Sequence, residues 1–193
     1  MFATLVRHQV RDFDTWKLAF DADEPARVGA GFVMHNMHVD ADDPNAVVVF
    51  LAAPSLSSIN GFLNMPALDQ AMAAAGVVGE PSILVMENKT LDLGGPDAKA
   101  GVVLQHPVAD FAAWKAAFDA HSAARSDAGI AGHSVNTLAA DGNQVVAYMQ
   151  SDDMAKIKGL VNSADLKSAM AAAGVTGPPT LWFVNHVEMK TYA

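Results

Sequence analysis

The alternation of apolar and polar residues over the first 90 positions predicts strands and helices in a fixed order. An extended apolar run covers 2–8, and Asp12 follows at a position suited to a helix N-cap. Trp16 and Phe20 stand four residues apart, which places them on one face of the helix that begins there. We expect this helix to end at the glycines within 29–31.

The pattern continues with two strands, two short helices and a last strand. Strands are expected over 32–39 and over 46–53, and the second is apolar enough to be buried on both faces. Short helices are expected over 56–63 and 67–75, and the last strand over 81–87. This βαββαβ order is the ferredoxin-like motif, a four-stranded antiparallel sheet with helices on one face.

The second half of the chain repeats the first half at a constant offset of 98 residues and without a gap. About 40% of the positions between His8 and Met86 are identical in both copies. The segment 71–77 returns letter for letter as 169–175. Agreement over that length indicates a duplicated domain.

The Gly-Gly-Pro run at 94–96 cannot continue a helix or a strand and predicts a linker. We therefore expect repeat 1 over 1–90, the linker over 91–99 and repeat 2 over 100–193. The sheet face without helices is apolar in each repeat and needs a cover. The predicted fold class is α+β, with the two sheets packed against each other to form a barrel within one chain.

Composition and net charge restrict the kinds of partner that this protein is expected to bind. The formal net charge of −9 argues against nucleic acid and against an anionic membrane surface. Without cysteine there is no disulfide, no thiolate nucleophile and no cysteine-ligated metal. The first residues lack the apolar core of a signal peptide, and no apolar run approaches the roughly 20 residues of a membrane span. A cytoplasmic protein is expected.

A motif present in both copies resembles a known superfamily. It reads Val-x-Asp-Phe-x-x-Trp-Lys-x-x-Phe-Asp at 10–21 and 108–119, and Arg, Gly and later Gly-Val-x-Gly-x-Pro follow it. The pattern is similar to the dimeric α/β-barrel superfamily, in particular its antibiotic-biosynthesis-monooxygenase-like branch. The resemblance implies a barrel, usually a homodimer of single domains and here a tandem fusion. It carries over no catalytic residue, because the motif does not contain any.

Polar residues retained in both copies are the candidates for a site. His8 and His106, at the end of the first strand of each repeat, are candidate catalytic bases, or they bond a loop carbonyl. The candidate substrate-binding residues are Arg27, His35 and Trp16 in repeat 1 and Arg125, His133 and Trp114 in repeat 2. The arginines could bind a substrate carboxylate, or they could neutralise carbonyls at the end of a helix. The tryptophans are predicted to be core residues, and stacking against a ligand stays open.

Some combinations are excluded, and the copies differ. His8 and His35 should lie near 14 Å apart on strands one and two, too far for a catalytic dyad. His35 and His38 point to opposite faces of a strand, so no metal site is expected. Lys17 and Asp21 read as a solvated surface pair. Some polar positions differ between the copies, so that the pockets need not be equivalent; among them are His38 and Asn136, Asp23 and His121, and Asn88 and His186.

Three functions remain open, and the sequence leaves undecided whether the chain is an enzyme. The first is a cofactor-independent monooxygenase-like enzyme that acts on a small aromatic or polyketide-like molecule. The second is a non-catalytic ligand-binding or stress-related module. The third is a haem-binding barrel with His8, His35, His106 or His133 as axial ligand. Analogy at the level of the fold favours the first, without a cofactor, and further homodimerisation stays open.

Overall fold

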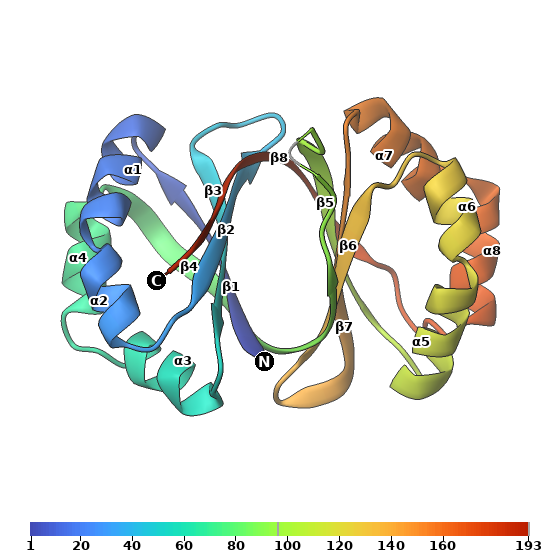
Figure 1. Ribbon diagram of the computed structural model, residues 1–193, viewed down its shortest axis with the longest axis horizontal. Helices are drawn as coiled ribbons and strands as arrows, with labels where there is room; N and C mark the ends of the chain where they lie inside the picture. Colours follow the sequence, from blue (N-terminus) through green and yellow to red (C-terminus); the bar gives the residue numbers. More distant parts are fainter. Residues whose placement is uncertain (96, 193) are drawn as a thin grey trace. The chain divides into compact units, whose positions relative to one another are not determined.

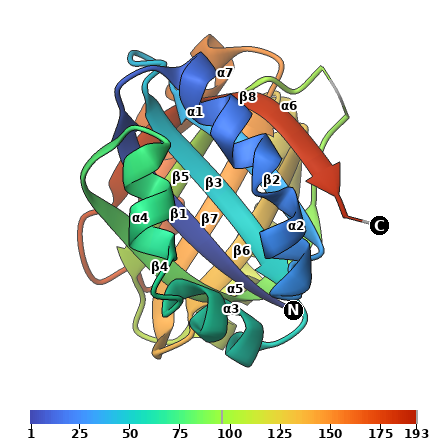
Figure 2. The same cartoon turned by 90° about the vertical axis from the view of Figure 1, so that its left-hand side faces the viewer.

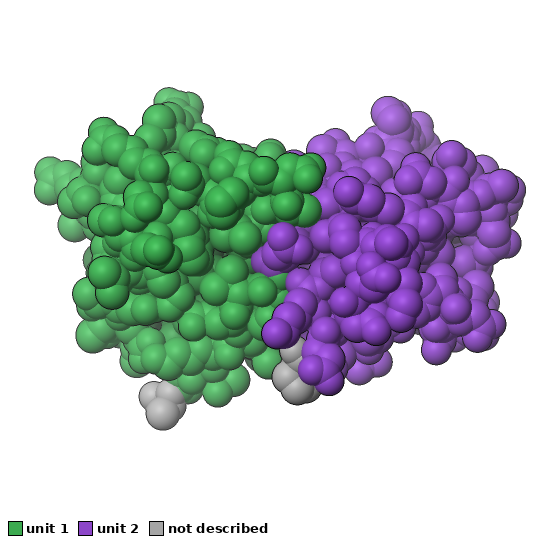
Figure 3. All heavy atoms as spheres, turned by 90° about the horizontal axis from the view of Figure 1, so that it is seen from above, with its two compact units in different colours: residues 1–87, 186–193 green, residues 88–185 purple. Residues whose placement is uncertain are grey.

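The computed structural model describes residues 1–95 and 97–192 and divides into two compact units (Figure 1 and Figure 3). Unit 1 holds Met1–Glu87 together with His186–Ala193, and unit 2 holds Asn88–Asn185. Pro96 of the predicted linker and Ala193, the last residue of predicted repeat 2, lie outside the described residues. Each unit therefore takes its last strand segment from the other half of the sequence.

Repeat 1 contains the predicted elements in the predicted order. These are β1 (Phe2–Val10), α1 (Phe13–Ala22), α2 (Glu24–Gly29), β2 (Met34–Asp40), β3 (Ala46–Ala53), α3 (Leu56–Leu63), α4 (Leu68–Ala74) and β4 (Val77–Asp92). The strands are antiparallel: β3 pairs with β1 and with β2, and β1 also pairs with β4. Helices α1 to α4 cover one face of this sheet (Figure 2).

Repeat 2 follows the same order. Its elements are β5 (Ala100–Pro107), α5 (Phe111–Ala120), α6 (Ser122–Asp127), β6 (Gly132–Leu138), β7 (Asp141–Ser151), α7 (Met154–Asn162), α8 (Ala164–Ala172) and β8 (Thr180–Thr191). Strand β7 pairs with β5 and β6, and β5 pairs with β8. The α+β class with two ferredoxin-like repeats is confirmed.

Strands β4 and β8 each belong in part to both units. The hydrogen-bonded order is β1-β3-β2-β8-β5-β7-β6-β4, and it closes on itself. The predicted strand over 81–87 was therefore too short, since β4 begins at Val77 and runs through the start of the predicted linker to Asp92. Local composition missed this extension because the residues after Glu87 pair within the other unit, next to β6.

The first long helix of each repeat was also predicted without its break. Instead of continuing to 29–31, α1 ends at Ala22 and α2 begins at Glu24. Pro25 near the start of α2 cannot donate a backbone hydrogen bond. Repeat 2 breaks at the same place without a proline, so the break belongs to the fold. In both repeats an arginine side chain donates a hydrogen bond to a backbone carbonyl in the last turn before this break.

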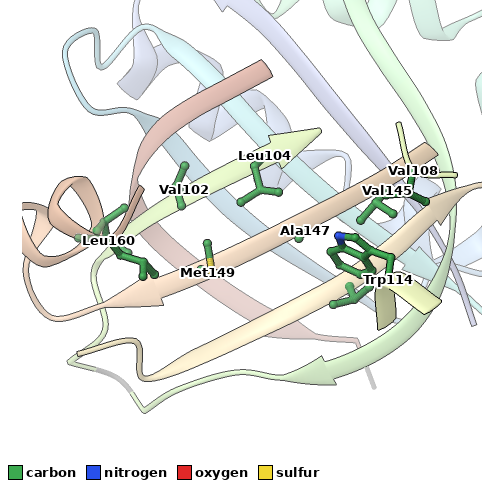
Figure 4. Packing of buried hydrophobic residues seen from close by; sticks show 11 residues of the cluster. Val102, Leu104, Val108, Trp114, Val145, Ala147, Met149 and Leu160 are labelled. Atoms are coloured by element: carbon green, nitrogen blue, oxygen red, sulfur yellow. The ribbon is translucent and has the colours of Figure 1, made fainter. Parts of the chain in front are cut away.

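Each unit has its own apolar core between sheet and helices. In unit 2, Figure 4 shows Trp114 of α5 beside Val108, Val145 and Ala147. In unit 1 the corresponding cluster contains Trp16, and both tryptophans are 4% exposed. The predicted core role of both residues is confirmed by this burial. Strand β3 is nearly buried throughout, as its apolar composition predicted.

Candidate functional site

A row of side chains from β1, α1 and α2 crosses the helix-covered face of unit 1. The ring of His8 lies 5.3 Å from that of Trp16, and Trp16 stacks on Phe20 at 5.1 Å. The guanidinium of Arg27 lies 3.6 Å from the centre of the Phe20 ring. His35 of β2 meets the same ring edge-on at 5.1 Å. The residues that the repeat singled out are thus neighbours in space, with Phe20 joining them.

Unit 2 contains the same row at the equivalent positions. His106 lies 5.5 Å from Trp114, and Trp114 stacks on Phe118 at 5.1 Å. Arg125 lies 3.7 Å from the centre of the Phe118 ring, and His133 lies 5.3 Å from that ring. Both rows follow from an aromatic pair spaced four residues apart on one helix face.

His8 and His106 are buried without a hydrogen bond to any described residue. His8 is 9% exposed and His106 is 2% exposed, and neither ring nitrogen of either residue has a partner. The alternative that they bond a loop carbonyl is therefore not seen. Burial lowers the pKa of each to about 4, so that both imidazoles are neutral at pH 7. A neutral imidazole of this kind offers one donor and one acceptor to a ligand.

Arg27 is almost fully buried and uses two of its three nitrogens. Its Nη1 donates to the carbonyl of Phe20 at 2.7 Å, so the guanidinium does neutralise the end of helix α1. Its Nε donates to the hydroxyl of Tyr192 at 2.9 Å. Its Nη2 has no partner among the described residues, although the side chain is only 2% exposed. The two sequence interpretations therefore coexist: one nitrogen caps the helix and another is free for a ligand.

His35 sits at the centre of a polar network in unit 1. Its Nδ1 lies 2.8 Å from the Tyr192 hydroxyl, and its Nε2 lies 2.9 Å from a carboxylate oxygen of Glu188. With both nitrogens occupied in this way, it makes no hydrogen bond to His8, as the strand spacing predicted. Glu188 also accepts from Lys17 at 2.9 Å. Lys17 therefore bridges two carboxylates, Glu188 and the Asp21 of the expected surface pair.

The pKa values of this network reflect burial and contact. Burial lowers the pKa of His35 in spite of the carboxylate beside it. Partial burial by itself would raise the pKa of Glu188, but the hydrogen bonds from Lys17 and His35 hold it below its ordinary value. Near pH 7 the network therefore contains a neutral imidazole and an ionised carboxylate.

The two rows border cavities of very different size. The cavity in unit 1 has a volume of about 380 Å³ and that in unit 2 about 60 Å³. Along the walls, Val6 in unit 1 is replaced by the larger Leu104 in unit 2. His121 at the edge of the smaller cavity bonds Asp165 at 2.9 Å, a contact that Asp23 and Ala67 cannot make in unit 1. One larger side chain and one added bridge thus accompany the smaller cavity.

The cavity of unit 1 is apolar apart from three residues. Its polar lining consists of His8, Arg27 and Asp23. The remaining wall is formed by aromatic, aliphatic and alanine side chains, among them Ala71 and Met72 of α4. A cavity of this size with few polar groups suits a small, largely apolar ligand.

Three residues of this site were missed in the sequence. Phe20 was treated as part of the helix core, although its presence in both copies was a usable signal. Tyr192 and Glu188 gave no signal, because the equivalent positions are Gly94 and Thr90. They reach unit 1 through the end of β8, a placement that only the exchanged strand segments reveal.

The diverged residues form matched pairs. His38 and His186 lie 5.4 Å apart in unit 1, ring edge to ring face. The equivalent positions in unit 2 hold Asn136 and Asn88, whose amide side chains hydrogen-bond at 3.0 Å. Each pair joins the second strand of one repeat to the last strand of the other. Burial lowers the pKa of His38 to about 3, so this histidine is neutral.

No group of three or more histidine, cysteine, aspartate or glutamate side chains within 1–95 and 97–192 could hold a metal ion. None of the helices that the structure describes is long and apolar enough to cross a membrane.

Comparison with known proteins yields structural neighbours only. No protein-family model matches the chain, and no curated protein matches it. A solved anthrone oxidase-like protein aligns over 98% of this chain and 92% of its own, with TM-score 0.71 and 15% identity. A candidate monooxygenase from Lactobacillus acidophilus NCFM aligns over 98% and 95%, with TM-score 0.65 and 9% identity. A heme-binding protein from Thermus thermophilus aligns over 97% and 91%, with TM-score 0.56 and 14% identity.

These neighbours have the dimeric α/β-barrel fold, and the chain shares it as a tandem fusion of two ferredoxin-like repeats. Within that class its neighbours include monooxygenase-like, chlorite dismutase-like and heme-binding proteins and a regulator of staphylococcal pathogenesis. The resemblance stated from the sequence is confirmed at the level of the fold. At such low identity the likeness does not select one activity.

Proposed function

We propose that the cavity of unit 1 is the working site of a cofactor-independent, monooxygenase-like enzyme for a small aromatic substrate. The observation that carries this is the pairing of an apolar cavity of about 380 Å³ with a neutral, unpartnered histidine in its wall. The stacked rings of Trp16 and Phe20 offer a flat surface to an aromatic body. The site residues His8, Trp16, Arg27 and His35 are thus assigned to one pocket or its border.

His8 is placed to act as a base and Arg27 to hold the resulting negative charge. A neutral imidazole accepts a proton from an activated C–H or O–H group of the substrate. The enolate oxygen so formed would accept a hydrogen bond from Nη2 of Arg27. The electron-rich carbanion reacts with O₂, and a methylene becomes a carbonyl while the second oxygen atom leaves as water. The atoms and electrons of one substrate and one O₂ then balance those of the carbonyl product and water, without an added reductant.

Oxygen uptake with anthrone as the trial substrate tests this proposal. We expect one O₂ consumed per anthrone, and we expect His8→Gln to abolish turnover while the unfolding temperature stays nearly constant. Ala71→Trp should block the cavity of unit 1, whereas the matched Ala169→Trp in unit 2 should leave turnover unchanged. Full turnover by His8→Gln would contradict the assignment of the base.

The non-catalytic alternative uses the same cavity. Binding of the neutral aromatic fluorophore N-phenyl-1-naphthylamine, blocked by Ala71→Trp but without any oxygen uptake, would favour a ligand-binding module. In that case His8 and Arg27 serve recognition alone.

The haem alternative fits these residues poorly. His8 has nitrogens free for an axial bond, but both nitrogens of His35 are engaged. Haem also carries two propionates, and Arg27, beside Asp23, is the one lysine or arginine among the described residues that line the cavity. Added haemin should therefore give no Soret band shift, and a stoichiometric shift would restore this alternative.

We also propose that the two halves pair within one chain and that the protein works in the cytoplasm. Support for the pairing comes from β4 and β8, each of which has residues in both units. Light scattering should then give the mass of one folded chain at low concentration. The domain limits 1–90, 91–99 and 100–193 remain part of this proposal, and cell fractionation tests the location.

A further inference from the structure

A chain of hydrogen bonds leads from the cavity of unit 1 to its surface. In order, its members are Arg27, Tyr192, His35, Glu188 and Lys17. Two of them, Glu188 and Tyr192, come from the last residues of the sequence, near and just after the end of β8. The final segment of repeat 2 therefore completes the site whose other residues belong to repeat 1.

The donors and acceptors of this chain point in one direction. An ionised Glu188 only accepts, so the hydrogen of neutral His35 is on Nε2, which lies 2.9 Å from the carboxylate. Nδ1 is then an acceptor and takes the hydroxyl hydrogen of Tyr192 at 2.8 Å. The Tyr192 oxygen in turn accepts from Nε of Arg27 at 2.9 Å. The carboxylate thereby sets the orientation of the hydroxyl that holds the arginine.

This arrangement fixes the guanidinium on two sides and leaves one nitrogen unused. Nε is bound by Tyr192, and Nη1 is bound by the carbonyl of Phe20. Nη2 has no partner among the described residues at a side-chain exposure of 2%, in a residue that lines the cavity. A buried donor on a charged group is costly to leave unpaired, so an acceptor oxygen on the ligand is expected there.

Unit 2 lacks the tyrosine and the glutamate of this hydrogen-bond chain at the equivalent positions. Thr90 and Gly94 stand where unit 1 has Glu188 and Tyr192. A Cβ on Gly94 would lie only 2.9 Å from the backbone carbonyl oxygen of Ala131. A tyrosine side chain cannot take the equivalent place without moving this backbone. Arg125 is therefore held without a tyrosine from the last strand segment.

Asp23 is the one carboxylate among the described residues that line the cavity. Its Oδ2 lies 3.8 Å from Nη1 of Arg27, at 44% exposure, so solvent screens the pair. It offsets part of the positive charge but leaves Nη2 unpaired. An anionic ligand oxygen would thus meet both the directed hydrogen bond from Nη2 and the positive charge that Asp23 leaves uncompensated.

We propose that Tyr192 and Glu188 are positioning residues that hold Arg27 for an aromatic ligand bearing an anionic oxygen group, such as a phenolate, carboxylate or sulfonate. The segment that ends repeat 2 thereby makes unit 1 the selective site of the pair. This inference rests on the proposed use of the unit 1 cavity, and its test separates the two.

Two fluorescent probes that differ in charge provide the test on the full chain. N-phenyl-1-naphthylamine is neutral, and 8-anilino-1-naphthalenesulfonate has the same body with a sulfonate. Tyr192→Phe removes one hydroxyl, and we expect the Kd of the sulfonate to rise about fivefold while that of the neutral probe changes less than about twofold. Glu188→Gln should act in the same direction, and Glu80→Gln, an equal charge change at an exposed position, should not.

The outcomes distinguish the two proposals. If Ala71→Trp abolishes binding of both probes but Tyr192→Phe leaves their affinity ratio unchanged, the cavity is used and the positioning role is refuted. If Ala71→Trp affects neither probe, the proposed function itself fails. A loss of structure in Tyr192→Phe would weaken both probes equally and so count against the selective role.

Asp23→Asn provides an independent test of whether the site favours negative charge on the ligand. The substitution should not disturb the fold, because the side chain of Asp23 caps no helix. Removing this carboxylate should tighten binding of the sulfonate probe severalfold and leave the neutral probe unchanged. Unchanged or weaker sulfonate binding would overturn the assignment of Nη2 as the anion donor.

Discussion

At the scale of single residues, His8 and His106 combine deep burial with the absence of a hydrogen bond. Such histidines contribute nothing to stability by pairing, and they weaken the fold in acid. In the unfolded chain each takes up a proton near its ordinary pKa of about 6.5, whereas in the folded state burial lowers the pKa to about 4. Stability is present above pH 6.5 and is lost as the pH falls toward 4.

This effect can be measured by urea unfolding at pH 7 and pH 4.5. We expect His8→Gln to reduce the acid-induced loss of unfolding free energy by on the order of 2 kcal/mol relative to the parent. His106→Gln should act alike, because its environment is the same. Equal acid sensitivity in variant and parent would show that the folded protein protonates these rings freely.

At the scale of elements, the first helix of each repeat depends on an aspartate at its N-cap. The side chain of Asp110 accepts from the backbone nitrogen of Ala113 at 2.7 Å at the start of α5. We expect Asp110→Ala to lower the free energy of unfolding by about 1 kcal/mol and Asp110→Asn to retain most of it. Chemical denaturation at neutral pH measures the difference, and equal losses in both variants would point away from capping.

The unequal cavities also belong to this scale, since a larger wall residue and a helix-to-helix bridge are among the differences between them. Leu104→Val with Asp165→Ala gives unit 2 the residues of unit 1 at both positions. We expect this double variant to bind two molecules of N-phenyl-1-naphthylamine where the parent binds one. Titration to saturation measures the stoichiometry, and an unchanged value would mean that other side chains fill the second cavity.

At the scale of the whole molecule, the exchanged ends of β4 and β8 make each unit depend on the other half of the sequence. Tyr192 donates its backbone N–H to the carbonyl of Val33 at 2.8 Å, directly before β2. We expect deletion of 186–193 to increase hydrogen exchange in β2, which neighbours β8, and to spare the pairing of β5 with β7. Uniform loss of protection would indicate that the chain unfolds as one cooperative unit.

Much of this architecture could be predicted from local patterns. The constant offset between the two halves indicated a duplicated domain. Apolar periodicity predicted the elements of both copies, because strands and helices bury one face at fixed spacing. Retention in both copies also selected His8, Trp16, Arg27 and His35, which the structure brings to one row or its edge. The bounds of β4 and the break after α1 were not predictable, since long-range pairing and an arginine cap determine them.

Hydrophobic periodicity and self-similarity are local properties, so the amino-acid order is enough to show that two like domains of one fold follow each other. Which half has the larger cavity and the complete network depends on tertiary contacts, which no local pattern contains. Glu188 and Tyr192 are more than 150 positions from Arg27 and His35, as the hydrogen-bond partners show. No spacing rule connects residues that far apart, and they meet because the last strand segment of the chain is built into the unit of the first repeat.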